Sequence, residues 1–527
     1  MYMKHLFPYI LGGAMLVSAA GCNKLDQAPY GSAIVEDQYY TTLDQCNTST
    51  MVAYRYINYS TWWEILNWRY LAGEAASDNG WVGNTYQPHP TYDAAAHFTL
   101  DAGNDRNEAQ WIDLYKSIGR FNSTIAGITD APIPEANKKQ FIAELKFLRA
   151  WCYFDLIRNW GPVPLVLEIY PPNTHLPRSS VQDVYNQIDK DLNECIAVLP
   201  KKGAYPAADR FRASRGAALT LLAKASLYME NWPKAESLSK LVIDEGDYNL
   251  EQQFSTLWQY TYKNGIESIF EIQNGSSQVP ALPFNQFQVV LNSPGDAGWG
   301  YYSVSSDLEN AYKSEGDSIR LQWTINRHGL PVAGDPNAPS FDGRPWPASS
   351  SSKSARFSRK HYTPKAERPA NGLSSLNDKI LRFADVLLIH AEACAMQQKS
   401  GEALGSLKKV RDRVNLLTDM NLTGWNLINA VRKERRLEMA YEGDRLYDIR
   451  RWKDQNGKPV ISGIMGPQGS FVLYNTTIST DPFETKNTTE LQNKGTSFRE
   501  NTHMLWPIPA SQILLSEGAM QQNPGYF

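Results

Sequence analysis

Three glutamates near the C-terminal third of the chain have a spacing that suits acid–base chemistry. Glu434, Glu438 and Glu442 lie four residues apart, so they share one face of a predicted helix. Two neighbouring carboxylates can serve as acid and base in glycoside hydrolysis. Arginines at positions 435 and 445 lie three residues from Glu438 and Glu442, and such pairing neutralises the acids instead of raising the pKa of one of them. We therefore expect a salt-bridge network that holds a helix to its scaffold, and no catalytic residues.

Other sequence signals of chemistry are missing. The chain has no HExxH, GxSxG, P-loop or GxGxxG motif, and its eight histidines lack metal-ligand spacing. The cysteines form no CxxC pair, which argues against a zinc site. We expect no metal, no cofactor and no enzymatic activity. Buried free thiols are expected for the cysteines at positions 46, 152, 195 and 394.

Aromatic residues are abundant, with 15 Trp, 28 Tyr and 18 Phe, and rings exposed in loops suit stacking on sugars. Glycan recognition needs flat aromatic faces beside amides or carboxylates that orient hydroxyl groups. Two loop stretches, within 78–107 and 273–302, offer this mixture. The candidate ligand-binding residues are Trp81, Asn84, Tyr86, Trp299, Tyr301 and Trp323. The alternative for each ring is packing in the core.

The N-terminus carries a targeting signal. Residues 6–17 form an apolar run that is too short to span a bilayer, and small residues lead from it into Cys22. We interpret residues 1–21 as a lipoprotein signal peptide and Cys22 as the lipidation site, carrying fatty acyl groups such as palmitate. Ala19 stands where a lipobox usually has Leu, and ordinary secretory cleavage is the alternative. The mature chain is expected to be anchored to a membrane without crossing it.

The elements that position these residues are mostly helices. Apolar residues recur at spacings of three and four and predict helices at 144–159, 179–199, 214–230, 234–244, 380–398 and 402–414. The third and fourth of these, and the last two, form antiparallel pairs with alanine at the crossing positions, as in tetratricopeptide repeats. The expected fold is mostly α, a scaffold of helix pairs with long loop-rich insertions. A strand is expected at 470–474.

Five motifs, in order, resemble one family, the SusD/RagB nutrient-uptake lipoproteins of Bacteroidetes. They are LDQAPYG at 25–31, AELKFLRAWCYFDL with NWGPVP at 143–164, LRFADVLLIHAEA at 381–393, KERRLEMAYEGDRLYDIRRW at 433–452, and LWPIP with QNPGY at 505–526. The resemblance covers nearly the whole mature chain. It implies a single SusD-like domain over 22–527, with an N-terminal part at about 22–240 and a C-terminal part at about 265–527.

The resemblance also implies a function. Members of this family are outer-membrane lipoproteins facing the cell exterior that capture oligosaccharides, or sometimes peptides. They deliver the ligand to a SusC-like TonB-dependent transporter, and their genes lie in polysaccharide-utilisation loci. A helical-repeat adaptor for protein partners and a peptide-capturing lid of the transporter stay open as alternatives, and a glycosidase is a third hypothesis. Net charge is −3 with no basic stripe, so no nucleic-acid partner is expected.

Overall fold

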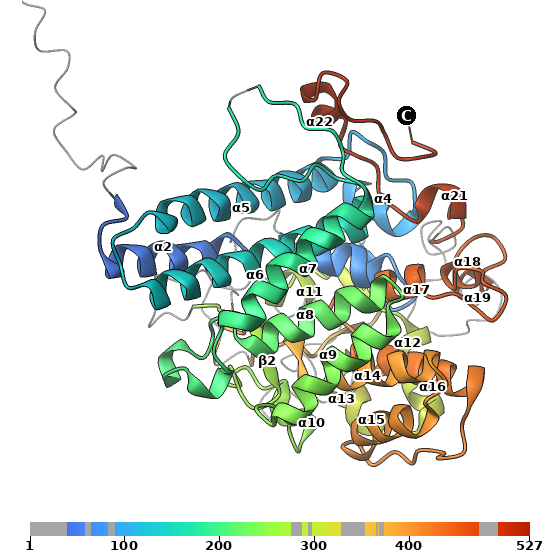
Figure 1. Cartoon of the computed structure of the whole chain (residues 1–527). Helices are drawn as coiled ribbons and strands as arrows, with labels where there is room; N and C mark the ends of the chain where they lie inside the picture. The colour runs from blue at the N-terminus through green and yellow to red at the C-terminus, as the bar shows by residue number, and fades with distance from the viewer. Residues whose placement is uncertain are drawn as a thin grey trace, which may run out of the picture.

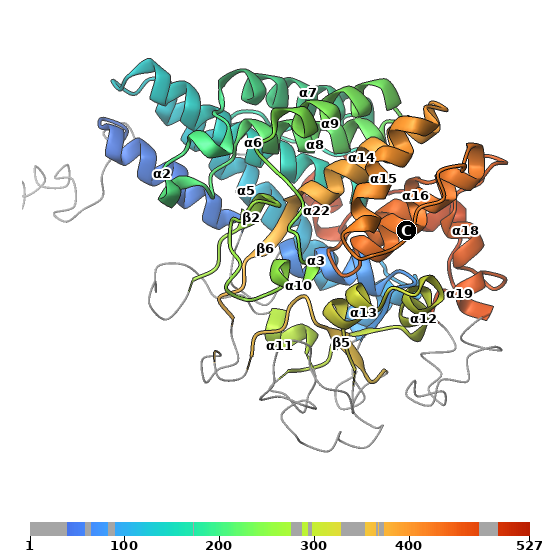
Figure 2. The same cartoon turned by 90° about the horizontal axis from the view of Figure 1, so that it is seen from below.

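The computed structural model shows a helix-rich protein, which confirms the predicted fold class (Figure 1). It describes residues 39–57, 65–82, 90–171, 173–275, 287–292, 298–327, 354–364, 367, 374–473 and 494–526. Seen from below, the long helices gather along the upper edge, while the short helices α11 and α13 and the strand β5 lie toward the opposite side (Figure 2). The long helices and these three short elements therefore lie on different sides of the molecule.

The N-terminal part is built around one buried helix. α6 is buried along almost all of its second half, because apolar residues occur on every side of it, as expected for a helix surrounded by others. It ends at Gly161, which adopts a positive φ of 70°. The elements up to this point are α2 (Leu43–Tyr56), α3 (Ile65–Tyr70), the π-helix η1 (Leu71–Ala75), α4 (Pro90–His97), α5 (Asp105–Thr129) and α6 (Glu135–Trp160).

Helix pairs continue the scaffold, as predicted. Serines 180 and 214 cap two of the helices by accepting hydrogen bonds from the backbone N–H three residues later. α9 packs against α14 and so joins the two predicted repeat pairs. The helices are α7 (Val181–Val198), α8 (Arg215–Tyr228), α9 (Trp232–Glu245), α14 (Phe383–Met396), α15 (Ser400–Asp412) and α16 (Gly424–Glu438), with 3-10 turns at Lys202–Ala204 and Ala207–Asp209.

Two predicted elements were wrong. Ile380 was placed at the start of a helix, but it lies in the strand β6 (Asp378–Arg382), and α14 begins at Phe383. All five residues of this strand are buried although three of them are charged, and its apolar Ile380 lies four residues before Ala384, so the residue continues the period of the helix that follows. The strand expected at 470–474 is the short helix α19 (Ser470–Leu473).

Three antiparallel two-stranded sheets complete the fold. β1 (Gly80–Val82) pairs with β3 (Tyr302–Val304), with Trp81 opposite Ser303. β2 (Ser268–Ile272) pairs with β6, and β4 (Ile325–Arg327) with β5 (Arg356–Ser358). The short helices are α10 (Phe254–Leu257), α11 (Phe287–Leu291), α12 (Ser306–Glu315), α13 (Ser318–Thr324), α17 (Arg445–Arg451), α18 (Ile461–Ile464), α21 (Glu500–His503) and α22 (Ala510–Leu515).

The four described cysteines, at positions 46, 152, 195 and 394, are buried free thiols, as predicted. Burial raises the pKa of the Cys152 and Cys195 thiols well above the ordinary value, so these two stay protonated at neutral pH. Among the helices that the structure describes, none combines the length and the apolar character needed to cross a bilayer.

Candidate ligand-binding site

Backbone pairing fixes the position of the loop that carries Trp299 and Tyr301. The N–H of Trp299 donates to the carbonyl of Val289 at 2.6 Å, and the N–H of Tyr301 donates to that of Val290 at 3.0 Å. The next residue, Tyr302, begins β3, which is held by β1. The two predicted rings therefore sit on an ordered segment between α11 and a sheet.

Three rings form a row at this place, which we call the aromatic cluster (Trp299, Tyr301 and Tyr92). The ring centroids of Trp299 and Tyr301 are 5.7 Å apart, and those of Tyr301 and Tyr92 are 6.0 Å apart with an interplanar angle of 22°. Trp299 and Tyr301 are partly exposed, whereas Tyr92, from α4, is buried. The structure thus joins two of the predicted residues in one partly exposed surface.

Polar groups adjoin the cluster. The guanidinium of Arg106 lies 5.4 Å from the centre of the Tyr92 ring and 3.3 Å from the carboxylate of Asp105. Burial raises the pKa of Tyr301, so its hydroxyl keeps its proton and can donate a hydrogen bond. Flat rings beside such groups match the composition of a sugar-binding surface.

Tyr92 and Arg106 were not among the predicted residues. Both lie in the aromatic- and Asn-rich stretch 78–107, but they belong to helices α4 and α5 and not to loops. The stacking of Tyr92 on Tyr301 depends on a contact across about 200 positions, which local sequence patterns do not contain.

Trp81 is not part of an exposed surface, contrary to expectation. It is 2% exposed and packs 5.4 Å from the ring of Phe471, with the ammonium of Lys494 4.9 Å from its ring centre. Trp81 is the middle residue of β1, all three residues of which are buried, and its ring packs in the core. Trp81 is therefore a structural residue.

The structure assigns Trp323 to a different cluster from Trp299 and Tyr301. Trp323 is partly buried on a small apolar cluster that contains Trp258, and the guanidinium of Arg359 lies 4.6 Å from its ring centre. A ligand contact of this ring stays a prediction. The predicted residues Cys22, Asn84 and Tyr86 lie outside the described residues.

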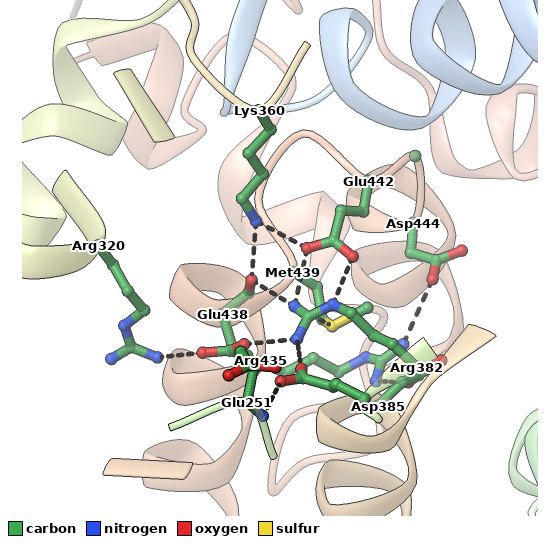
Figure 3. A network of polar contacts seen from close by, with 12 residues as sticks. Glu251, Arg320, Lys360, Arg382, Asp385, Arg435, Glu438, Met439, Glu442 and Asp444 are labelled. Atoms are coloured by element: carbon green, nitrogen blue, oxygen red, sulfur yellow. Dashed lines mark hydrogen bonds and ion pairs between the residues drawn. The ribbon is translucent and has the colours of Figure 1, made fainter. Parts of the chain in front are cut away.

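The glutamates that suggested catalysis belong to a buried ionic network (Figure 3). Glu434 accepts from Arg320 at 2.5 Å, and Glu438 accepts from Arg320 at 3.0 Å and from Arg382 at 2.6 Å. Glu442 lies beyond the end of α16, so it does not share a helix face with the other two. It receives two hydrogen bonds from Arg382, at 2.7 and 2.8 Å.

The predicted pairing within this motif was wrong in detail. Arg435 does not bond to Glu438 but donates to Asp385 at 2.5 Å and to Asp448 at 2.7 Å. Arg445 holds Asp78 through two bonds of 2.8 Å. The partners come from other elements, so the motif joins α16 and α17 to distant parts of the chain, which local spacing cannot indicate.

Electrostatics keeps these acids ionised. Burial by itself would raise the pKa of Glu438, but the nearby charges of Arg413, Arg382 and Arg320 hold it well below its ordinary value. The pKa of Glu442 is likewise lowered against burial, by Arg382 and Lys360. A proton donor for glycoside cleavage needs the opposite shift, so these two carboxylates fit a structural role.

Among the described residues, no group of three His, Cys, Asp or Glu side chains is arranged to hold a metal ion.

Comparison with known protein families agrees with this fold. The model of the SusD family matches residues 266–526, and a model described as starch-binding and associating with the outer membrane matches residues 25–227. The chain belongs to the SusD/RagB family.

Individual relatives are distant in sequence but similar over most of their length. A SusD-like protein of Bacteroides ovatus is 26% identical over 486 residues, covering 86% of this chain and 83% of the relative. A solved laminarin-binding SusD-like protein matches with a TM-score of 0.72 at 24% identity, over 92% of this chain and 100% of that one. Surface glycan-binding protein A of Bacteroides fluxus matches with a TM-score of 0.73 at 22% identity, over 92% and 100%.

Proposed function

We propose that this protein is a non-catalytic glycan-binding lipoprotein of the outer membrane. It is tethered through Cys22 after removal of residues 1–21, faces the cell exterior as one SusD-like domain, and delivers captured oligosaccharide to a SusC-like TonB-dependent transporter. Membership of the SusD/RagB family supports this role, as do the relatives described as binding laminarin or surface glycans.

The observation that carries the proposal is the aromatic cluster. Hydrogen bonds fix the backbone of Trp299 and Tyr301, and their side chains stay partly exposed, although burying such rings is strongly favourable. A segment whose backbone is already held loses little conformational freedom when its rings stack on the apolar C–H face of a sugar. Hydroxyl and guanidinium groups at the edge of the cluster then orient the sugar hydroxyls. We infer that the ligand crosses this surface.

Binding measurements on variants test the proposal. The soluble chain from residue 23 is run against laminarin, starch and other polysaccharides by affinity gel and calorimetry, with Trp299→Ala and Tyr301→Ala. Stacking is worth about 0.5–1.5 kcal/mol per aromatic pair beyond area burial, so a comparable gain on a sugar face predicts that each variant weakens binding by roughly two- to tenfold. Trp425→Ala is the matched control, because Trp425 is also partly buried but belongs to α16 and packs against another apolar cluster.

Three outcomes would count against the proposal in different ways. Full binding by both variants would place the ligand elsewhere. Binding to no glycan would favour the peptide-capturing lid or the helical-repeat adaptor. Release of shortened glycan over time would contradict the non-catalytic role. Tethering is tested separately, since Cys22→Ala should move the protein from the membrane fraction to the soluble one without changing glycan affinity.

A further inference from the structure

Arg450 is a buried cation that has no counter-charge among the residues described by the structure. It lies on α17 and is 6% exposed, and within the described part of the chain its Nε and both terminal nitrogens donate no hydrogen bond. The neighbouring buried arginines behave differently. Arg435, for example, contacts Asp385 and Asp448, and Arg451 contacts Glu392.

A second unpaired donor lies beside it. The guanidinium carbon of Arg450 is 4.3 Å from the ring centre of Trp506, whose side chain is fully buried. The indole Nε1–H of Trp506 has no acceptor among the described residues. By contrast, the buried indole of Trp68 donates to Asn159 at 3.0 Å, and that of Trp452 donates to Glu392 at 2.7 Å.

The described groups that face Arg450 do not compensate its charge. Tyr447 and Tyr526 face it, and their hydroxyls donate to Asn159 and to the carbonyl of Leu505. Desolvation lowers the pKa of Arg450 to about 10. Because this value lies above neutral pH, the side chain stays charged. Arg499 adds positive charge nearby. Burial is the main cause that lowers the pKa of His503 to about 4, and the charges of Arg499 and Arg450 lower it further.

Aromatic rings complete the surroundings. Trp506 packs edge-on against Trp68 at 6.0 Å and stacks on Phe98 at 6.0 Å. The Trp506 ring face attracts the guanidinium, but a ring face accepts none of its five N–H groups in the plane of the fork. Buried donors of this kind require an acceptor, and a buried cation requires a negative charge. A small anion supplies both at once.

We propose that Arg450 and Trp506 bind a small monovalent anion, either a halide or a simple carboxylate, which the N–H groups of both side chains coordinate. A carboxylate matches the fork of the guanidinium with two parallel bonds, whereas a halide accepts the same donors without directional preference. Arg450 lies between the family-like motif residues Asp448 and Arg451, so the anion belongs to this part of the scaffold and not to the aromatic cluster. The proposal is independent of glycan binding.

Thermal unfolding at constant ionic strength tests the site. Sodium chloride or sodium acetate replaces the sodium salt of HEPES, whose anion is much larger than chloride or acetate. Each tenfold increase in anion concentration above Kd should raise the Tm of the natural chain by about 1 °C, since the anion binds the folded state alone. A larger increase with acetate than with chloride identifies a carboxylate site, and the reverse a halide site.

Arg450→Met removes the charge but keeps an apolar chain over Trp506, so its Tm should not depend on either anion. Arg158→Met is the matched control, because Arg158 is equally buried but pairs with Asp155 and Asp444. It should be less stable yet keep the anion dependence. A flat response of the natural chain, or an equal response of Arg450→Met, overturns the proposal.

Bromide gives a readout that needs no variant. Crystals of the natural chain soaked in sodium bromide should show an anomalous peak within hydrogen-bond distance of the Arg450 guanidinium if the site takes a halide. After a sodium acetate soak, planar difference density at the same position indicates a carboxylate. Water-like density there under both soaks overturns the proposal, even where Arg450→Met fails to fold.

Discussion

Arg382 and Glu442 are joined by two hydrogen bonds, from Nε to Oε2 at 2.7 Å and from Nη2 to Oε1 at 2.8 Å. The pair ties the end of β6 to the turn that follows α16, sixty residues later in the chain (Figure 3). Lys360 adds a third contact to the same carboxylate at 2.7 Å. Both side chains of the pair are almost fully buried, so the contact is screened little by solvent.

Glu442→Gln should therefore destabilise the protein strongly. Neutralising the carboxylate leaves Arg382 and Lys360 with less buried counter-charge, and breaking a buried pair costs about 3–5 kcal/mol. Chemical denaturation measures the change, with exposed Glu402→Gln as the control, expected within about 0.5 kcal/mol of the natural chain. The folded pKa of Glu442 is lowered, so its contribution is present above the unfolded pKa and is lost as pH falls. A gap between variant and natural chain that does not narrow toward acid pH would contradict this account.

Glu74 should give the opposite pH dependence. It is fully buried in the π-helix η1, and desolvation raises its pKa to about 7, against hydrogen bonds from Asn79 and from the N–H of Gly443. Between the unfolded pKa and 7 the folded state holds a proton that the unfolded state has released. The stability that this group contributes is therefore complete below about pH 4.5 and is lost as pH rises to about 7.

Glu74→Gln removes this titration. Relative to the natural chain, the variant should gain up to about 3 kcal/mol between pH 4.5 and pH 8, because one pKa unit corresponds to about 1.4 kcal/mol. Any loss of hydrogen bonding to Asn79 shifts the difference equally at every pH. Denaturation of both proteins at several pH values measures the gain, and a difference in stability that is constant with pH would refute the raised pKa.

Gly73 marks a close approach of two backbones. A Cβ at this position would lie 2.2 Å from the carbonyl oxygen of Gly443, which is rigid backbone with a φ of 88°. Gly73→Ala should therefore destabilise the protein by about 1–3 kcal/mol, the usual cost of overpacking. In exposed Gly405 of α15 a Cβ meets nothing within 4 Å, so Gly405→Ala should stabilise by about 0.5–1 kcal/mol. Thermal unfolding distinguishes the two signs, and equal effects would contradict the packing argument.

Periodicity predicted the long helices well, because a helix in this scaffold is decided by local spacing and by caps such as Ser180 and Ser214. It was wrong at Ile380, whose spacing to Ala384 and Leu387 continues the period of α14 although the residue lies in the strand β6. It also did not show that Glu442 lies past the end of α16. Element ends depend on tertiary contacts, which a window of neighbouring residues does not contain.

The site was predicted less completely than the fold. Aromatic composition indicated the segments of Trp81 and Trp299. The structure buries Trp81 and leaves Trp299 partly exposed, and this difference depends on which face of β1 packs against Phe471 and Lys494. The ionic network shows the same limit. Sequence spacing indicated that the glutamates pair with arginine, while the identity of the partners follows from the packing of distant elements.

The contrast between Trp81 and Trp299 gives a last prediction, in which stability and binding separate. Trp81→Ala removes a large ring from the core and leaves a cavity between Phe471 and Lys494, which should cost about 3–5 kcal/mol. Trp299→Ala removes a partly exposed ring and should cost much less stability while weakening glycan binding. Chemical denaturation and calorimetry of the folded variants measure the two quantities. Since Trp81 is covered, its variant should bind glycan like the natural chain wherever it stays folded. Loss of glycan affinity in folded Trp81→Ala, with stability unchanged, would instead place that ring in the ligand site and show that the segment around β1 opens when ligand binds.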